Sequence, residues 1–359
     1  MAAVTVRAGA APYTVLVGRG ALVELPRLVQ GLGVSQAVVV TDTNVGAHWA
    51  DPVAASLSGL GTAASVLAVE PGEGAKSLAE LARVLAFFED RGLDRRGLVV
   101  ALGGGTVGDL AGFAAAVWLR GIRCIQVPTT LLAMVDSSVG GKTSVNTART
   151  KNSVGAFWQP VAVVADLAAL DTLPESEYRP AFAEICKYGV TLDAELAASV
   201  ERRAPALLAR EGAALEAVIS RCVELKAAVV EADERESGPR QILNYGHTVG
   251  HAVEVATSYS TPHGLAVAYG MRVAVRIAEA MHICGPDVGR AQAAMLGAYG
   301  LDSGRPDTSP EAVLRSLGRD KKAVAGRARW VLPTALGRAR VGVDVADPIV
   351  DREVRWLFA

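Results

Sequence analysis

The sequence predicts an α/β domain over residues 1–174 and a helical domain over residues 175–359. Up to about residue 170, short β-branched runs alternate with helical patterns, which is the rhythm of a parallel sheet. Beyond that point, apolar residues recur mostly at three- and four-residue spacing over long Ala-, Leu- and Glu-rich segments. The stretch "DTLPESEY", residues 171–178, contains a proline and forms the junction between the α/β pattern and the helical pattern.

Individual elements follow from the same patterns. The runs "QAVVVTDTNV", "GLVVALGGG", "IRCIQVPTT" and "VAVVADLAAL" predict strands within residues 36–45, 97–105, 122–130 and 161–170. Residues 77–92, "SLAELARVLAFFEDRG", carry the helical period between the first two of these strands. In the second half, only residues 329–345 predict strands, as a late hairpin.

Composition limits the class of protein. Of 359 residues 51% are apolar, the formal net charge is -1 and 5% are aromatic, so a basic surface for nucleic acid is not expected. The N-terminus does not resemble a secretory signal, and no window is apolar enough to span a membrane. The four cysteines are scattered without CxxC spacing, which favours reduced thiols. We therefore expect a soluble cytoplasmic protein that acts on a small molecule.

The first chemical signal is "VVALGGGTVGDLAGFAA", residues 99–115. An apolar run reaches three glycines and opens into a small-residue helix, so backbone amides at a helix N-terminus could hold a pyrophosphate. A tight strand-to-helix turn without a ligand would explain the same glycines. Asp42 and Asn44 follow an earlier strand and could bind the hydroxyls or amide of a dinucleotide, although an ordinary turn is the simpler interpretation of that pair alone.

A second glycine-rich segment spans residues 127–160. Lys142 follows a diglycine, and Lys151 with Asn152 forms a second basic-polar pair, an arrangement that could hold phosphate as a point charge. The segment is not a Walker motif, because Asp136 stands where the first glycine of GxxxxGK[ST] is required. A solvated loop with surface lysines is the competing interpretation.

Three of the five histidines lie within seventeen residues. His247 and His251 are four apart and share a helix face with Glu254, a pattern that commonly serves zinc, and His263 is placed to return from the next segment. Glu184 is a candidate carboxylate ligand. Polar surface is the alternative, but three histidines so close together in a histidine-poor chain favour a metal site.

Several segments together resemble one enzyme family. The stretches "GGGTVGDLAGFAAAVWLRGIRCIQVPTTLLAMVDSSVGGKTSVN", "KNSVGAF", "AEICKYG", "ELKAAVVEADERE", "ILNYGHTVGHAVE" and "RDKK" resemble, in order, the signature segments of the 3-dehydroquinate synthases, which are sugar-phosphate cyclases. The resemblance implies a Rossmann-like NAD-binding α/β domain, an all-α metal-binding domain with Zn²⁺ or Co²⁺, and a homodimer with its active site in the cleft between domains. It implies transient oxidation of 3-deoxy-D-arabino-heptulosonate 7-phosphate by NAD, phosphate elimination, re-reduction and aldol closure to 3-dehydroquinate in the shikimate pathway.

The resemblance also assigns residues. It implies Glu184, His247 and His263 as metal ligands, so that His251 faces the substrate phosphate instead. For the substrate it implies Asp136, Lys142, Asn152, Lys187, Lys226, Arg240, Asn244 and His251, with Arg120 contributed across the dimer interface and Lys321 or Lys322 reaching the carboxylate. For NAD it implies Asp42, Asn44, Glu73, Lys76, Gly104, Gly105, Asp109, Thr129, Thr130, Lys151 and Thr172.

Two departures from the family pattern leave alternatives open. Leu265 stands where many members have glutamate after His-Gly, and "NTARTKN" lacks a common proline and glycine. Neither change removes a ligand, but both leave room for the aminodehydroquinate synthases of the aminoshikimate pathway, which make antibiotic precursors. A glycerol dehydrogenase-type oxidoreductase would not need Lys142, Asn152 and Arg240, and a catalytically silent scaffold would lack at least one metal or phosphate residue.

Overall fold

The computed structural model describes residues 1–59, 61–148, 150–323 and 329–359, except for the side chains of residues 319–323. The chain forms two compact units. The first comprises Met1–Leu173 and Leu215–Arg235, and the second comprises Pro174–Ala214 and Glu236–Ala359. Residues 215–235 therefore pack with the first unit, whereas their helical period predicts them in the helical half. The domain boundary after residue 174 stays a prediction.

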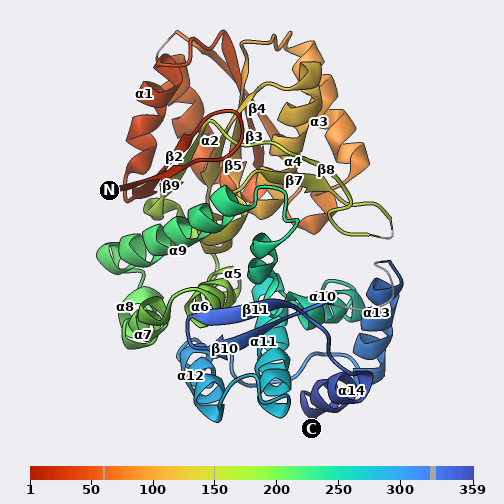
Figure 1. Cartoon of the computed structure of the whole chain (residues 1–359). Helices are drawn as coiled ribbons and strands as arrows, with labels where there is room; N and C mark the ends of the chain where they lie inside the picture. The colour runs from red at the N-terminus through yellow and green to blue at the C-terminus, as the bar shows by residue number, and fades with distance from the viewer. Residues whose placement is uncertain (60, 149, 324–328) are drawn as a thin grey trace. The chain divides into compact units, whose positions relative to one another are not determined.

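A sheet organises the first unit (Figure 1). It has seven strands in the order β1-β2-β9-β6-β5-β3-β4. Strand β1 runs antiparallel to β2, and the remaining neighbours pair in parallel. The predicted parallel sheet is confirmed. Its strands are β1 (Ala2–Val6), β2 (Tyr13–Gly18), β3 (Gln36–Asp42), β4 (Ala63–Val69), β5 (Leu98–Gly103), β6 (Arg123–Pro128) and β9 (Ala162–Asp166).

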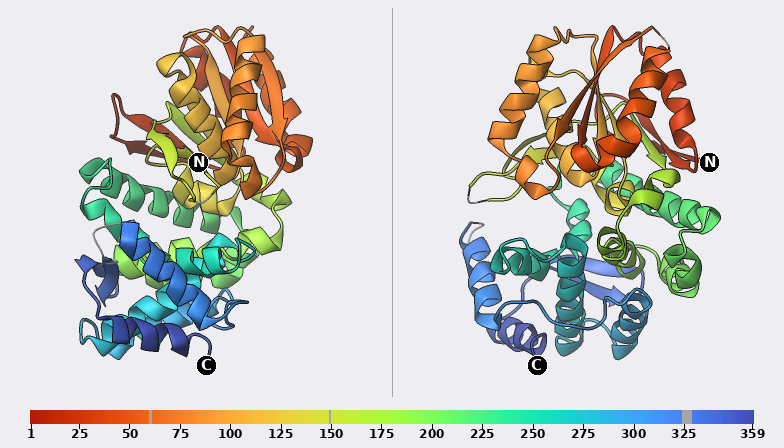
Figure 2. Two further views of the ribbon diagram at one scale, coloured as in Figure 1. Left: turned by 90° about the vertical axis from the view of Figure 1, so that its right-hand side faces the viewer. Right: turned by 180° about the vertical axis from the view of Figure 1, so that it is seen from behind.

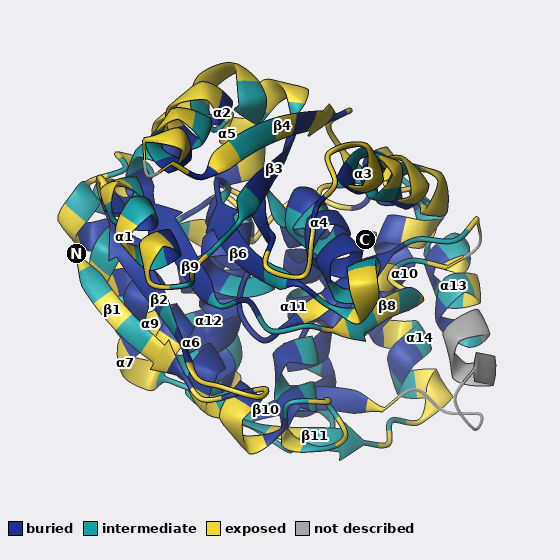
Figure 3. Cartoon of the chain, turned by 90° about the horizontal axis from the view of Figure 1, so that it is seen from above, coloured by how far each residue is buried: buried dark blue, intermediate teal, exposed yellow. Residues whose placement is uncertain are grey.

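Helices cover both faces of this sheet, because its strands alternate side chains between two apolar cores. Val38 and Val40 of β3 pack with α3 (Leu78–Asp90) and α4 (Gly105–Val117), whereas Ala37 and Val39 pack with α1 (Leu25–Gln30) and α2 (Thr43–Ser58). Strands β6 and β9 are accordingly almost wholly buried (Figure 3). The helices and helical turns are η1 (Ala21–Glu24), α1 (Leu25–Gln30), α2 (Thr43–Ser58), η2 (Glu73–Ala75), α3 (Leu78–Asp90), α4 (Gly105–Val117), η3 (Trp118–Arg120), η4 (Ala133–Ser137) and η5 (Leu167–Thr172).

Two further elements complete the first unit. A small antiparallel pair, β7 (Lys142–Val145) and β8 (Val154–Phe157), carries a loop that includes Asn146, Lys151 and Asn152. Helix α9 (Gly212–Ala232) belongs to this unit from Leu215 onward. This helix brings Lys226 into the same unit as the sheet.

The second unit is helical apart from one hairpin (Figure 2). The strands β10 (Trp330–Ala335) and β11 (Arg338–Val343) pair antiparallel, as the pattern over residues 329–345 predicts. Within the described residues, no helix is long and apolar enough to cross a membrane. The helical elements are α5 (Glu175–Tyr178), α6 (Phe182–Thr191), α7 (Ala194–Arg202), α8 (Ala204–Leu208), η6 (Pro239–Asn244), α10 (His247–Ala256), α11 (His263–Ala280), α12 (Pro286–Gly297), α13 (Pro310–Ala323) and α14 (Asp347–Trp356).

A glycine-lined crossing holds α10 against α11. Gly270 of α11 faces the carbonyl of Gly246, and Gly250 of α10 faces the backbone of Ala266. A Cβ atom on Gly270 would lie closer than 3.0 Å to the Gly246 carbonyl oxygen. Gly246 itself has a φ of 80°, a backbone conformation that glycine adopts readily. The two helices, which begin at His247 and His263, can therefore approach backbone to backbone.

Candidate active site

The second unit gathers three potential metal ligands around a buried carboxylate. Glu184 lies in α6, and its side chain is 0% exposed. Its Oε1 lies 3.4 Å from His247 Nε2 and 3.5 Å from His263 Nε2. Lys187, one helical turn along α6, forms an ion pair with the other oxygen, Oε2. The structure thus groups Glu184, His247 and His263, the three residues predicted as metal ligands.

These three donors fit a zinc ion. Their atoms all lie within 4.8 Å of one another. Two donors bound about 2.0 to 2.1 Å from one tetrahedral zinc lie about 3.3 Å apart, close to the two separations measured from Glu184 Oε1. One carboxylate with two imidazoles is also a donor set found at catalytic zinc sites, where a fourth position stays open.

The protonation of the two histidines differs. Burial lowers the pKa of His247 to about 3, against the attraction of Glu184. Its Nδ1 donates to the carbonyl oxygen of Tyr245 at 3.1 Å, so Nε2 carries the lone pair that faces Glu184. Burial also acts to lower the pKa of His263, but hydrogen bonds to Glu184 and Glu254 raise it to about 9. His247 is therefore held in the neutral form that ligates metals.

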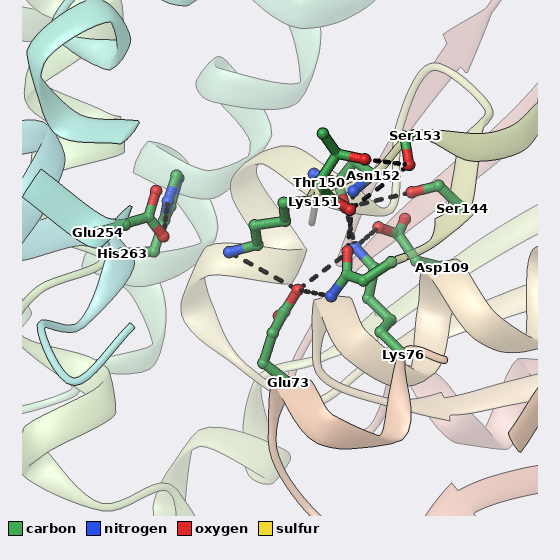
Figure 4. A network of polar contacts seen from close by, with 11 residues as sticks. Glu73, Lys76, Asp109, Ser144, Thr150, Lys151, Asn152, Ser153, Glu254 and His263 are labelled. Carbon is green, nitrogen blue, oxygen red and sulfur yellow. Dashed lines mark hydrogen bonds and ion pairs between the residues drawn. The ribbon is translucent and has the colours of Figure 1, made fainter. Parts of the chain in front are cut away.

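Glu254 orients the third ligand. Its side chain is 4% exposed, and Oε1 accepts a hydrogen bond from His263 Nδ1 at 3.2 Å (Figure 4). This contact turns Nε2 of His263 toward Glu184. His251 is exposed and its ring lies 5.2 Å from that of His247. A second set of donors, His251, Glu254 and His263, also lies within 4.8 Å, but the hydrogen bond between Glu254 and His263 already uses two of these groups.

In the first unit, Lys76 is the centre of a polar network (Figure 4). Its side chain is 4% exposed, and its ammonium donates to Asp109 Oδ2 at 2.5 Å and to Asn152 Oδ1. Glu73 Oε1 lies 3.7 Å from the Lys151 ammonium and 4.0 Å from that of Lys76. Burial raises the pKa of Asp109, and Lys76 counteracts that shift. Five predicted site residues are thereby brought into one connected group.

The glycine loop has the close packing that its residues predict. A Cβ atom on Gly104 would lie 2.9 Å from Thr130 Cγ2, and one on Gly105 would lie 2.9 Å from Ser137 Oγ. Gly104 is the N-cap of α4, and no side-chain hydrogen bond caps it. The hydroxyl of Thr129 is buried without a hydrogen-bond partner in the described structure. Backbone amides at this helix start are therefore suited to an anion.

Two other predicted residues have local structural contacts. Asp42 caps α2, because its Oδ1 accepts from the backbone amides of Asn44 and Val45, each at 2.9 Å. This contact agrees with the simpler interpretation of Asp42 and Asn44 as part of an ordinary turn. The role of Asp42 in binding NAD stays a prediction. Thr172 donates to the carbonyl oxygen of Ala169 at 3.1 Å.

Charged groups predicted to bind substrate occupy both units. In the first, the Lys226 ammonium donates to both the backbone and the side chain of Asp136. In the second, Arg240 is 1% exposed, and Asn244 Nδ2 donates to Glu236 Oε1 at 2.6 Å. Burial of a cation costs free energy, and a charged partner or hydrogen bonds offset that cost.

Two of the remaining predicted residues lie at the surface, and two lie in α13. Lys142 at the start of β7 and Arg120 in η3 are exposed, and Arg120 has a φ of 67°. The backbones of Lys321 and Lys322 lie in α13, but their side chains lie outside the described structure.

Comparison with known proteins decides the family. The model of the 3-dehydroquinate synthase N-terminal domain matches residues 66–180, and that of the 3-dehydroquinate synthase C-terminal domain matches residues 181–323. The 3-dehydroquinate synthase of Geobacter metallireducens is 47% identical over 340 residues, which cover 94% of each chain. That of Gloeobacter violaceus is 44% identical over 343 residues, or 95% of each chain. The chain belongs to the 3-dehydroquinate synthase family.

Solved structures support the 3-dehydroquinate synthase-like fold. A 2-deoxy-scyllo-inosose synthase complexed with carbaglucose-6-phosphate, NAD+ and Co2+ is 25% identical, with a TM-score of 0.92, covering 99% of this chain and 100% of that one. The 2-epi-5-epi-valiolone synthase of Streptomyces hygroscopicus, with NAD+ and Zn2+ bound, is 25% identical, with a TM-score of 0.89, covering 98% of each chain. A sulfoacetaldehyde reductase from Bifidobacterium kashiwanohense, 15% identical with a TM-score of 0.70 and covering 96% of each chain, shares the fold. These relationships do not favour the aminodehydroquinate synthase or glycerol dehydrogenase alternatives.

Two residues of this 3-dehydroquinate synthase-family site received no role from the sequence. Glu254 shares a helix face with His247 and His251, but its spacing could not show that it contacts His263 rather than a metal. Asn146 contacts Glu73, 73 positions earlier, and no local pattern signals that contact.

We expect Glu254→Ala to lower the Zn²⁺ affinity of the metal-free protein by about 10- to 100-fold, because His263 loses the group that orients it. Competition with a chromogenic zinc chelator measures this affinity without any assay of activity. Glu254→Gln should give an intermediate value, since its side-chain oxygen can still accept from Nδ1. Wild-type zinc affinity in the Ala variant would show that His263 needs no such support.

Proposed function

We propose that this chain converts 3-deoxy-D-arabino-heptulosonate 7-phosphate to 3-dehydroquinate and phosphate, as a phosphate-eliminating carbon–oxygen lyase. The observation that carries the proposal is the relationship to curated 3-dehydroquinate synthases at 41% to 47% identity over most of the chain. The grouping of Glu184 with His247 and His263 supports it, because such a reaction needs a site for a divalent metal.

NAD is the proposed organic cofactor. Two sugar-phosphate cyclases of similar fold contain NAD+ in their solved structures, and the glycine loop of this chain is suited to a pyrophosphate. Bound NAD would supply a hydride acceptor that returns its hydride within each turnover. The residues proposed to hold it are Asp42, Asn44, Glu73, Lys76, Gly104, Gly105, Asp109, Thr129, Thr130, Lys151 and Thr172.

Glu184, His247 and His263 would hold Zn²⁺ or Co²⁺. The metal would supply Lewis acidity toward neighbouring hydroxyl and ketone oxygens of the substrate. Lys187 is 1% exposed beside Glu184, so its ammonium is well placed to bind a substrate oxygen close to the metal ligands.

Cationic and polar side chains would hold the charged groups of the substrate. A lysine binds phosphate as a point charge, and a guanidinium binds carboxylate or phosphate through a planar fork. The residues proposed for the phosphate are Lys142, Asn152 and His251, and those proposed for the remainder of the substrate are Asp136, Lys187, Lys226, Arg240 and Asn244. Lys321 or Lys322 would bind the carboxylate.

We further propose a homodimer in the cytoplasm, without nucleic-acid or membrane partners. Arg120, which is exposed, would act in the site of the other subunit. Mixing an Arg120→Ala protein with a His247→Ala protein tests this arrangement. Hybrid dimers would then contain one site with both residues intact, and part of the lost activity should return on mixing.

The proposed reaction predicts that purified protein supplied with the heptulosonate phosphate, NAD and Zn²⁺ releases phosphate without net formation of NADH. Each hydride removed from the substrate is returned to it, so NAD is not consumed. A colorimetric phosphate assay and absorbance at the NADH maximum measure the two quantities in one sample. Accumulation of NADH in proportion to turnover would instead indicate a dehydrogenase.

Sedoheptulose 7-phosphate and glucose 6-phosphate are the matched control substrates, because both lack the carboxylate. The cation that would bind the carboxylate is left without a partner, which should cost binding free energy, so kcat/KM should be far lower with either sugar. The amino analogue of the heptulosonate phosphate completes the comparison. Preference for a sugar phosphate that lacks the carboxylate would contradict the proposed carboxylate site.

A further inference from the structure

Asn146 closes a ring of hydrogen bonds that includes two predicted site residues. Its backbone amide donates to the carbonyl oxygen of Lys76 at 2.8 Å. Its Oδ1 accepts from the backbone amide of Asn152 at 2.8 Å. The Lys76 ammonium then donates to Asn152 Oδ1, which completes the ring (Figure 4). Each of the three residues is therefore held by the other two.

The other end of the Asn146 side chain reaches Glu73. Its Nδ2 donates to Glu73 Oε1 at 2.8 Å, the same oxygen that lies 3.7 Å from the Lys151 ammonium. The side chain thus accepts from a backbone amide at one end and donates to a carboxylate at the other. An aspartate of the same size can accept in this position but cannot donate.

The loop that Asn146 holds has an unusual backbone. Asn152 has a φ of 55°, in the left-handed region that asparagine tolerates better than most residues. In that conformation its side chain receives hydrogen bonds from Lys76 and, at 3.2 Å, from Ser144 Oγ. The direct hydrogen bond from the Asn152 amide to Asn146 supports this arrangement.

We propose that Asn146 is a positioning residue that couples nucleotide binding to phosphate binding. It ties Glu73 and Lys76, proposed for NAD, to Asn152, proposed for the substrate phosphate. Loss of its donor function releases the Glu73 side chain and loosens the loop. Glu73 and Lys76 are then no longer held in a fixed position relative to Asn152. This inference rests on the proposed function, because it takes the roles of those three residues from it.

Asn146→Asp is the test variant, since it keeps the size and the acceptor but places a carboxylate against Glu73. The dissociation constant of NAD, measured by isothermal titration on substrate-free protein, should rise by at least about tenfold. The KM for the sugar phosphate should rise as well. Thr147→Ala is the matched control, because it removes hydrogen bonds to Thr150 in the same loop and leaves the ring intact. NAD affinity should change less than about twofold in that control.

A double-mutant cycle separates positioning from general damage to the fold. In a Glu73→Gln background the amide introduced at position 73 can donate to the new aspartate, so Asn146→Asp should change the NAD dissociation constant by less than about threefold. An equal effect of Asn146→Asp in both backgrounds, or no effect in the wild-type background, would overturn the inference. A wild-type protein that binds no NAD would overturn the proposed function itself, and that titration comes first.

Discussion

His247→Ala should lose its bound metal and release phosphate from the heptulosonate phosphate at least about 10³-fold more slowly than the wild type. The change removes one of three donors around Glu184, and a metal contributes several kcal/mol to reactions of this type. Metal content is measured by elemental analysis of dialysed protein. Added Zn²⁺ at micromolar concentration should not restore the rate, because a site that has lost one of its three ligands binds the metal too weakly.

His251→Ala is the matched control on the same helix face. Its ring lies 5.2 Å from that of His247, but the proposed ligand set does not include it. We expect this variant to retain the metal content of the wild type while phosphate elimination slows. Equal metal in the wild type and both variants would contradict the assignment of His247, and loss of metal from His251→Ala alone would move the site to the second group of donors.

Gly270→Ala should lower the thermal midpoint of unfolding by about 5 °C or more and reduce metal content together with it. The added Cβ would lie closer than 3.0 Å to the carbonyl oxygen of Gly246, which is backbone and cannot rotate aside. Helix α10 must then move away from α11, and His247 and His263 begin those two helices. Calorimetry measures the thermal midpoint, and elemental analysis of the dialysed protein measures the metal content.

Gly318→Ala provides the comparison for that substitution. Gly318 also lies in a helix, but a Cβ atom there would have no neighbour within 4 Å. Its thermal midpoint should therefore stay constant or rise, because alanine favours a helix by up to about 1 kcal/mol over glycine. A loss of stability as large as that of Gly270→Ala would show that helix glycines, rather than the crossing, govern the effect.

Local sequence patterns predicted much of the fold. The β-branched runs and the helical period located four strands of the sheet and α3, because continuous apolar runs and helical spacing are properties of neighbouring residues. The return of Leu215–Arg235 to the first unit could not be predicted in this way. Its period is that of any amphipathic helix, and the surface against which such a helix packs is set by tertiary structure.

Part of the candidate site could likewise be predicted from the sequence, and part of it could not. The clustering of His247, His251 and His263 was visible because three rare residues lie close together in the sequence. Glu184 was a candidate carboxylate from the sequence, and the resemblance to a family selected it as their partner. The hydrogen bonds of Glu254 and Asn146 depend on how helices and loops pack, so residue type and spacing alone could not assign these two positioning roles.

The return of α9 to the sheet has a consequence for how the protein is made. Lys226 pairs with Asp136 across 90 positions of the chain, and Met1 pairs with Glu216 through its amino terminus. A ribosome therefore releases the whole seven-stranded sheet well before the segment that completes the unit has been synthesised. Until α9 has been synthesised, the nascent sheet lacks the contact between Lys226 and Asp136, while the first helices of the second unit emerge. A fragment that ends at Leu173 should remain in this incomplete state, because it never acquires α9.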